Sequence, residues 1–138
     1  MNLARLADEL KQDEGLRLLP YTDTVGKLTI GYGHDLSDLG ITPVQAEWLL
    51  HDDIVARLAD LTAALPWLPT LDDARQRVLA NMAFNLGVAG LLGFHKMLAA
   101  CERHDYFVAA EQMLNSQWAA QVGGRAIRLA NAMRAGGD

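Results

Sequence analysis

The spacing of apolar positions changes after the first dozen residues, and the change separates two kinds of element. Residues 3–13 carry leucine and alanine at helical spacing, which predicts a short helix with Asn2 as its N-cap. Gly15 is expected to end this helix and to leave Glu14 in its last turn. Residues 16–33 are instead rich in Thr, Tyr, Val, Ile and Gly, which predicts an antiparallel hairpin or a three-stranded sheet.

A loop over residues 35–41 and then a long helix are predicted next. Thr42 is the expected N-cap, Pro43 takes the first helical position, and Gln45 lies three residues after the cap. Apolar residues then recur at spacings of three and four until a proline ends the run, so the helix covers about residues 43–65. At about 1.5 Å per residue it forms a rod of roughly 34 Å, long enough to join two lobes.

The remainder of the chain is predicted to be helical. Thr70, with Asp73 three residues later, is a second capping signal and opens a helix that runs to Leu86. The glycines at the expected bend after it are Gly87, Gly90 and Gly93, and the further helices cover residues 94–103, 106–114, 116–121 and 124–135.

These elements predict one α+β domain over residues 1–138, with no repeat or linker that would divide it. A small N-lobe of about residues 14–50 holds the sheet, and the long helix joins it to a helical C-lobe. The C-lobe consists of residues 66–138 and includes the N-terminal helix of residues 1–13. A cleft between two lobes is a common place for a ligand.

Charge and composition exclude several classes of partner. The first 60 residues hold 5 basic against 11 acidic side chains and the rest 7 against 6, so nucleic acid is not expected to bind. The single cysteine, Cys101, excludes an internal disulfide and is expected to be buried. The four histidines lack ligand spacing, so no metal site is expected. We find no signal peptide and no apolar run that predicts stable membrane insertion.

The most informative chemistry lies in Glu14, Asp23 and Thr29. Glycosidic bond cleavage needs one carboxyl group to donate a proton and a second to act from the opposite side of the sugar. A Glu that closes a helix and an Asp in the following hairpin turn could face each other across a groove. Each residue also has an ordinary interpretation: a surface glutamate, a turn aspartate that bonds its own backbone, and a β-branched strand residue.

The pattern around these residues resembles a known signature. Residues 14–34 read E-G-x-R-L-x-x-Y-x-D-x-x-G-x-x-T-I-G-x-G-H, which resembles the phage-type lysozymes, the T-even phage lysozyme family (glycoside hydrolase family twenty-four). The similarity continues through residues 41–53 and 81–87 to Trp118 and Arg125, and so covers nearly the whole chain.

The resemblance implies a two-lobed muramidase that hydrolyses the β-1,4 bond between N-acetylmuramic acid and N-acetylglucosamine in peptidoglycan. Inversion is implied, with Glu14 as general acid and with Asp23 and Thr29 positioning the attacking water. A phage or prophage endolysin is expected: a monomer without a cofactor, held in the host cytoplasm until a separate holin releases it to the periplasmic peptidoglycan. The alternatives are a catalytically weak glycan-binding or structural module of a phage particle, and an enzyme for chitin-like polymers.

Four residues are candidates for substrate binding. Phe84 is expected to stack on a sugar or else to pack in the core, and Asn85 to support either Glu14 or Trp118. Gln112 is expected to contact a sugar unless it only faces solvent. Asp35 stands where the best-known family member has an apolar residue.

Three further residues are expected to support the site. Arg125 resembles the arginine that approaches the catalytic glutamate in the family. His34 is expected to form an ion pair with Asp53 that ties the sheet to the long helix. Two positions depart from the family. Met97 replaces a small polar residue of the best-known member. The segment after His34 is short, so the N-lobe is expected to be smaller than in the longest members.

Overall fold

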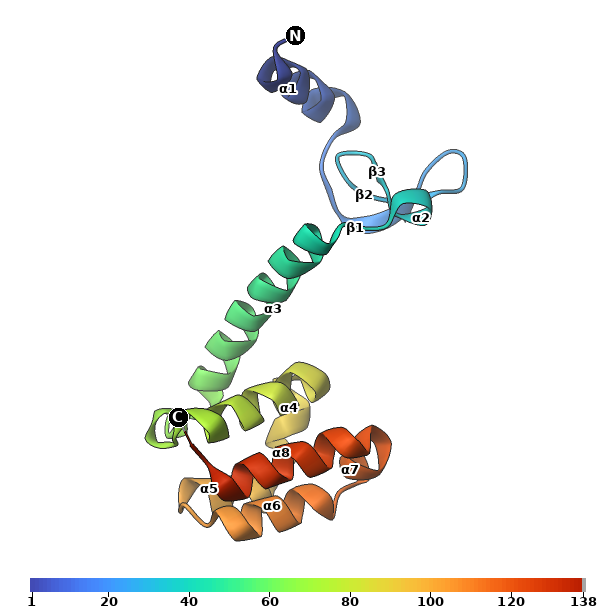
Figure 1. The fold of residues 1–138 in the computed structure, drawn as a ribbon. Coiled ribbons are helices and arrows are strands. Elements are labelled where there is room, and N and C mark those ends of the chain that lie inside the picture. The colour runs from blue at the N-terminus through green and yellow to red at the C-terminus, as the bar shows by residue number, and fades with distance from the viewer. Residues whose placement is uncertain (138) are drawn as a thin grey trace. The chain divides into compact units, whose positions relative to one another are not determined.

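Eight α-helices, three short strands and one 3-10 turn make up the regular structure of residues 1–137, the part of the chain that the computed structural model describes (Figure 1). In chain order they are α1 (Leu3–Glu14), β1 (Arg17–Thr22), β2 (Leu28–Gly31), β3 (His34–Asp35), α2 (Leu36–Leu39), α3 (Pro43–Ala64), η1 (Leu68–Thr70), α4 (Asp73–Leu92), α5 (His95–Glu102), α6 (Tyr106–Leu114), α7 (Gln117–Val122) and α8 (Gly124–Ala135). The chain forms two compact units, Met1–Leu49 and Leu50–Asp138, with the boundary in the sequence of α3, and each is described by itself below. The α+β class predicted from the sequence is confirmed. The grouping of residues 1–13 with the C-lobe stays a prediction.

The first unit holds a three-stranded antiparallel sheet in the order β1-β2-β3. Tyr21 pairs with Thr29 across β1 and β2, and Ile30 pairs with His34 across β2 and β3. Helix α1 precedes the sheet, and its first turn is capped as predicted, because the Arg5 N–H donates to Asn2 Oδ1 at 3.1 Å. The sheet and its turns set where the polar residues of this unit lie.

The prediction of a loop over residues 35–41 is wrong in part, because α2 forms a single helical turn there. Asp35 is its N-cap, and its Oδ1 accepts the Asp38 N–H at 3.0 Å. An aspartate with its own cap partner three residues later is enough to close one turn.

The long helix α3 begins with the predicted capping box. The Gln45 N–H donates to Thr42 Oγ1 at 3.2 Å, and the Thr42 N–H donates to Gln45 Oε1 at 2.8 Å. Two backbone donors that the helix itself cannot satisfy are thereby bonded. Helix α3 then runs from Pro43 to Ala64, one residue short of the predicted end.

The start of α4 differs from the prediction. Asp72, not Thr70, is the N-cap and accepts the Arg75 N–H at 3.2 Å, whereas the Thr70 hydroxyl donates to the Trp67 carbonyl. The backbone leaves helical geometry at Gly87 (φ 74°), as expected of the bend, but the helix resumes and reaches Leu92. Among the described residues no single helix is long and apolar enough to cross a membrane, and α4 with α5 meets that test only as a pair bent by 102°.

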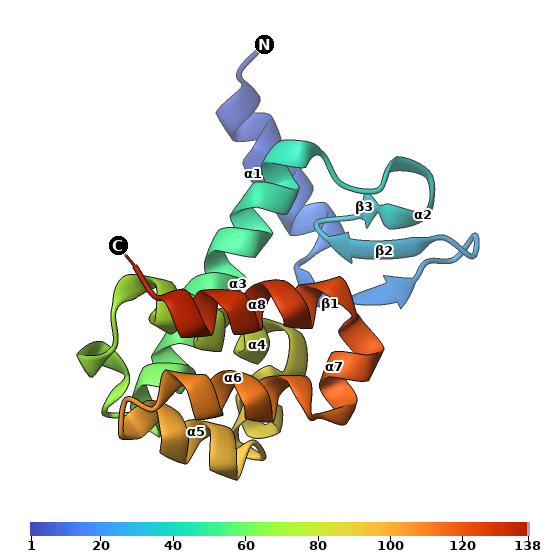
Figure 2. The same ribbon diagram turned by 60° about the horizontal axis from the view of Figure 1, so that its bottom comes forward.

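Methionine and leucine side chains from several helices fill the core of the second unit. Helices α6 and α8 lie side by side in both ribbon views (Figures 1 and 2), and α5 packs against α6. Met82, Met97, Met113 and Met133 come from α4, α5, α6 and α8, and each is at most 1% exposed. Burying one such side chain contributes about 1.5–3 kcal/mol, and the flexible thioethers fill gaps between short helices.

Candidate active site

Glu14 lies where α1 ends, with its carboxylate directly over Gly33. The Gly15 N–H closes the helix by donating to the Lys11 carbonyl at 3.1 Å. The side chain then reaches the turn between β2 and β3, where a Cβ atom built on Gly33 would lie only 2.8 Å from Glu14 Oε2. Gly33 has a φ of +75°, a conformation that glycine adopts without steric cost. The absence of a side chain at this position therefore leaves room for the Glu14 carboxylate.

Asp23 lies at the hairpin turn between β1 and β2, as predicted. Its Oδ1 accepts the N–H groups of Val25 at 3.0 Å and Lys27 at 2.8 Å. The ordinary interpretation, an aspartate that bonds its own turn, is therefore confirmed. Both bonds end on Oδ1. They fix the carboxylate as a whole, so the second oxygen, Oδ2, is held in position without a bond of its own to the turn.

Thr29 lies on the returning strand β2. At 3% exposed, it is the one residue that is buried within residues 1–49. Its hydroxyl donates to the Lys27 carbonyl at 3.0 Å. The same carbonyl accepts the Asp23 N–H at 2.9 Å, so Asp23 and Thr29 are both bonded to one residue. A hydroxyl with its proton engaged still has lone pairs that can accept a hydrogen bond from water.

His34 and Asp35 are both half-buried on β3. The His34 Nε2–H donates to the Gly40 carbonyl at 2.6 Å, a bond that sequence reasoning missed. Asp35 caps α2, which gives it a structural task, and its substrate contact stays a prediction. The ion pair of His34 with Asp53 also stays a prediction, because Asp53 belongs to the other unit.

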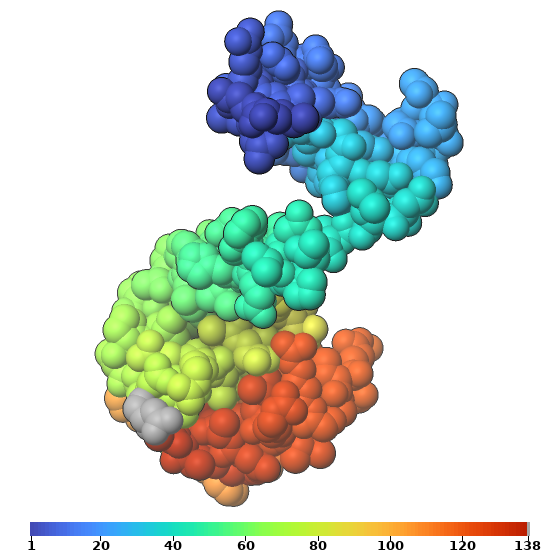
Figure 3. Space-filling model, turned by 45° about the horizontal axis from the view of Figure 1, so that its top comes forward, coloured from blue at the N-terminus to red at the C-terminus, as the bar shows by residue number. Residues whose placement is uncertain are grey.

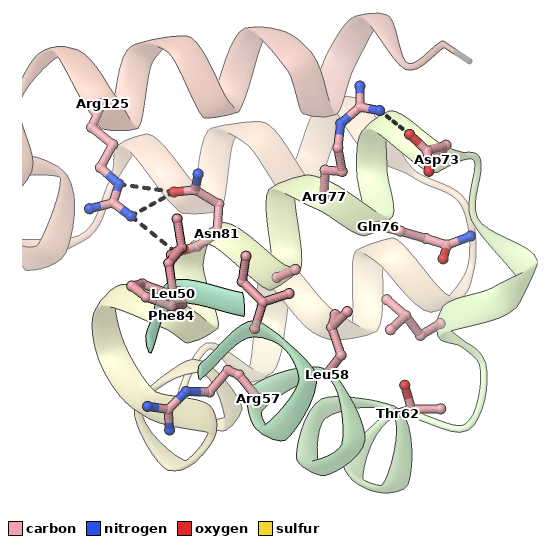
Figure 4. Close-up of a pocket in the computed structure, with 13 residues that line it drawn as sticks. Leu50, Arg57, Leu58, Thr62, Asp73, Gln76, Arg77, Asn81, Phe84 and Arg125 are labelled. Carbon is pink, nitrogen blue, oxygen red and sulfur yellow. Dashed lines mark hydrogen bonds and ion pairs between the residues drawn. The ribbon is translucent and has the colours of Figure 1, made fainter. Parts of the chain in front are cut away.

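The second unit has a pocket of about 610 Å³ between α3, α4 and α8 (Figures 3 and 4). Phe84 lines it and is 40% exposed, so its ring is not part of the closed core. Figure 4 shows Arg125 at one end, where its Nε donates to Asn81 Oδ1 at 2.9 Å and its Nη2 donates to the same oxygen at 2.7 Å. Asn81 as a partner of Arg125 was missed from the sequence, since the two are 44 positions apart. The approach of Arg125 to Glu14 stays a prediction.

Asn85 supports the core. Its Oδ1 accepts the Trp118 Nε1–H at 2.8 Å, which confirms one of its two expected tasks. Trp118 is 4% exposed and meets the Phe94 ring edge-on, with the ring centroids 6.2 Å apart. A buried indole N–H that finds an acceptor is the usual arrangement.

Gln112 is half-buried and lines a second, more open pocket of about 530 Å³ near the start of α5. Lys96 and Asn115 also line this pocket, so it carries several polar groups that can contact a sugar. Met97 reaches it as well but is 1% exposed, and so serves mainly as a core residue.

The first unit thus holds groups suited to acid–base chemistry. Glu14 offers a carboxyl group at the end of a helix, while Asp23 offers a carboxylate that is held by two backbone N–H groups. Thr29 adds a hydroxyl that is fixed by the same turn. Proton transfer and the positioning of a water molecule need groups of this kind in fixed places. Within residues 1–137 no cluster of three or more His, Cys, Asp or Glu side chains could hold a metal ion.

Comparison with known proteins gives consistent matches over most of the chain. The family model for phage lysozyme matches residues 11–134. The chain is 32% identical to the pre-baseplate central spike protein Gp5 of Enterobacteria phage T4, over 90% of this chain but only 26% of that protein. It is 28% identical to the probable T4-type lysozyme 1 of Dictyostelium discoideum, over 97% of this chain and 96% of that protein. It is 35% identical to the endolysin of Acyrthosiphon pisum secondary endosymbiont phage 1, over 57% and 55% of the two chains.

Proposed function

This chain belongs to the phage lysozyme family, and we propose that it hydrolyses the β-1,4 bond between N-acetylmuramic acid and N-acetylglucosamine in bacterial peptidoglycan. Membership places it among the glycoside hydrolases. The bond that is cut and the residues that cut it are the proposal.

In the proposed reaction Glu14 donates its proton to the glycosidic oxygen as the bond to the anomeric carbon breaks. A water molecule held by Asp23 and Thr29 attacks that carbon from the opposite face and passes its proton to Asp23. The configuration at the anomeric carbon is thereby inverted. Inversion needs the two carboxyl groups roughly 6.5–9.5 Å apart, so that a water molecule fits beside the sugar.

The observation that supports this assignment best is the shared anchoring of Asp23 and Thr29. Both bond to Lys27, so the two groups that would hold the water keep a constant relation to each other.

The biological setting is proposed from the family. As an endolysin the protein would stay in the host cytoplasm until a separate holin opens the inner membrane, and would then lyse the cell from the periplasmic side. The relative named an endolysin supports this setting.

The test compares the wild-type protein with Glu14→Gln on purified sacculi, measuring reducing ends released and sacculi bound. Because a general acid contributes about 10²–10⁴-fold, Glu14→Gln should lower the rate by at least about 100-fold and leave binding intact. Mass analysis of the released muropeptides, with and without borohydride reduction, identifies the sugar at the new reducing end. Release of N-acetylglucosamine ends, or cleavage of chitin oligomers but not sacculi, would contradict the proposed bond. An active Glu14→Gln variant would contradict the acid.

A second candidate is a glycan-binding or structural module of a phage particle. The similarity to a protein named as a baseplate central spike favours it. Binding to sacculi without any release of reducing ends by the wild-type protein would support this candidate over the enzyme.

A further inference from the structure

Lys27 connects the two residues proposed to hold the attacking water. Its N–H donates to Asp23 Oδ1 at 2.8 Å, and its carbonyl accepts the Thr29 hydroxyl at 3.0 Å. The same carbonyl accepts the Asp23 N–H at 2.9 Å. A rotation of the peptide groups on either side of Lys27 would therefore move the Asp23 carboxylate and the Thr29 hydroxyl together.

Helix α2 holds this segment from the side. The Lys27 ammonium donates to Asp38 Oδ1 at 2.8 Å and is also 2.8 Å from Oδ2. The next residue is held as well, because the Leu28 N–H donates to Ser37 Oγ at 2.8 Å. Asp38 is fixed in turn by its own N–H, which donates to Asp35 Oδ1 at 3.0 Å.

We propose that Asp38, acting through its ion pair with Lys27, is a positioning residue for Asp23 and Thr29. This inference rests on the proposed function, since it matters for the reaction only if those two residues hold the attacking water. Asp38 contacts neither of them directly and acts through the conformation of the turn at Lys27.

The size of the effect follows from the exposure of the pair. The Lys27 and Asp38 side chains are 39% and 56% exposed, and an ion pair so exposed contributes little to global stability. A misplacement of about 1 Å at a catalytic group can cost roughly 100-fold in rate. Because the turn keeps its own hydrogen bonds when the Lys27–Asp38 ion pair is lost, the expected loss in kcat is smaller, roughly 3- to 10-fold.

The experiment uses Asp38→Asn, Lys27→Met, their double variant and Lys27→Arg in the full chain. Purified sacculi serve as substrate, and kcat, KM and the melting temperature are measured for each protein. The matched control is Glu9→Gln, which removes the exposed Arg5–Glu9 ion pair in α1 of the same unit.

We expect each single variant to lower kcat by roughly 3- to 10-fold with KM within about twofold of wild type, because the turn affects chemistry rather than sugar contacts. The double variant should be no slower than the slower single variant, and Lys27→Arg should keep most of the wild-type kcat. Glu9→Gln should match wild type. Melting temperatures should change by no more than about 3 °C.

An unchanged kcat in Asp38→Asn would overturn the positioning task, as would losses that multiply in the double variant. If the loss of kcat is no larger than the lower melting temperature explains, the Lys27–Asp38 ion pair has only a structural role, and the proposal is overturned as well. The Glu14→Gln arm separates the two proposals. If wild type is active, Glu14→Gln is inactive and Asp38→Asn is silent, only this inference fails. If wild type releases no reducing ends, both fail.

Discussion

Replacing Gly33 by alanine would put a methyl group where the Glu14 carboxylate lies. The new Cβ would be 2.8 Å from Oε2 and 3.1 Å from Cδ, whereas ordinary van der Waals contact begins at 3.4 Å. The carboxylate must therefore move by about 0.6 Å, the difference between 3.4 and 2.8 Å. A second cost comes from the backbone, because a φ of +75° disfavours an L side chain by about 1–2 kcal/mol.

The two costs act on different quantities. The backbone cost lowers the free energy of unfolding, whereas the displaced atoms belong to the end of a flexible side chain that can swing away. If a 1 Å misplacement costs about 100-fold, a 0.6 Å displacement of Glu14 should lower kcat by roughly 10- to 20-fold. This corresponds to about 1.4–1.8 kcal/mol in the activation free energy.

The assay measures kcat on purified sacculi well below the melting temperature, together with urea unfolding. Gly40→Ala is the matched control, because Gly40 lies in the same unit at a φ of +60° with nothing within 4 Å of an added Cβ. Gly40→Ala should lose a similar amount of stability, through the same backbone cost of about 1–2 kcal/mol, and keep wild-type kcat. If Gly33→Ala loses stability but keeps kcat, the close approach of Glu14 to Gly33 does not position the acid, and the reasoning is refuted.

Three further predictions concern the helical unit. Burial acts to raise the pKa of Asp72, but hydrogen bonds from the Arg75 side chain and from the backbone lower it below its ordinary 3.8. The ionised carboxylate therefore stabilises the folded state above pH 3.8, and this stabilisation is lost as pH falls through the lower pKa of the folded state. Asp72→Asn keeps a capping side chain but should cost about 1–2 kcal/mol at pH 7 in urea unfolding, with a smaller difference at pH 2; equal losses at both pH values would contradict the charge effect. Burial raises the pKa of the Cys101 thiol to about 12, so Ellman's reagent at pH 8 should react only as fast as the protein unfolds, and rapid labelling of the native state would contradict this. Asn85→Ala removes the acceptor of the Trp118 indole N–H and should cost about 1–3 kcal/mol in urea unfolding followed by tryptophan fluorescence, whereas Asn85→Asp, which keeps an acceptor oxygen, should lose less.

Features that depend on neighbours in the sequence were predicted well. The Asn2 cap, the capping box of Thr42 with Gln45, and the stop at Gly15 all came from residues within four positions of each other. The error at the start of α4 has the same local origin, since Thr70 and Asp72 both fit a cap. Which of the two begins the helix depends on the 3-10 turn η1, which engages the Thr70 hydroxyl.

Partners far apart in the chain could not be predicted in this way. Arg125 binds Asn81 across 44 positions, and Lys27 binds Asp38 across 11, and neither pair follows a periodic pattern. A salt bridge or an amide contact on the surface requires only that two flexible side chains come within reach, which many polar residues could do. The fold decides which of them meet.

The sequence by itself determined the family and the α+β class, and it predicted Glu14, Asp23 and Thr29 as catalytic residues, because a dense motif and short-range capping rules depend only on residue type and spacing. The tertiary structure decided how these residues are held. It placed the Glu14 carboxylate over Gly33, and it joined Lys27 beside Asp23 and Thr29 to Asp38. The physical reason is that a hydrogen bond needs its two atoms within about 3 Å of each other, and only the folded backbone brings them that close.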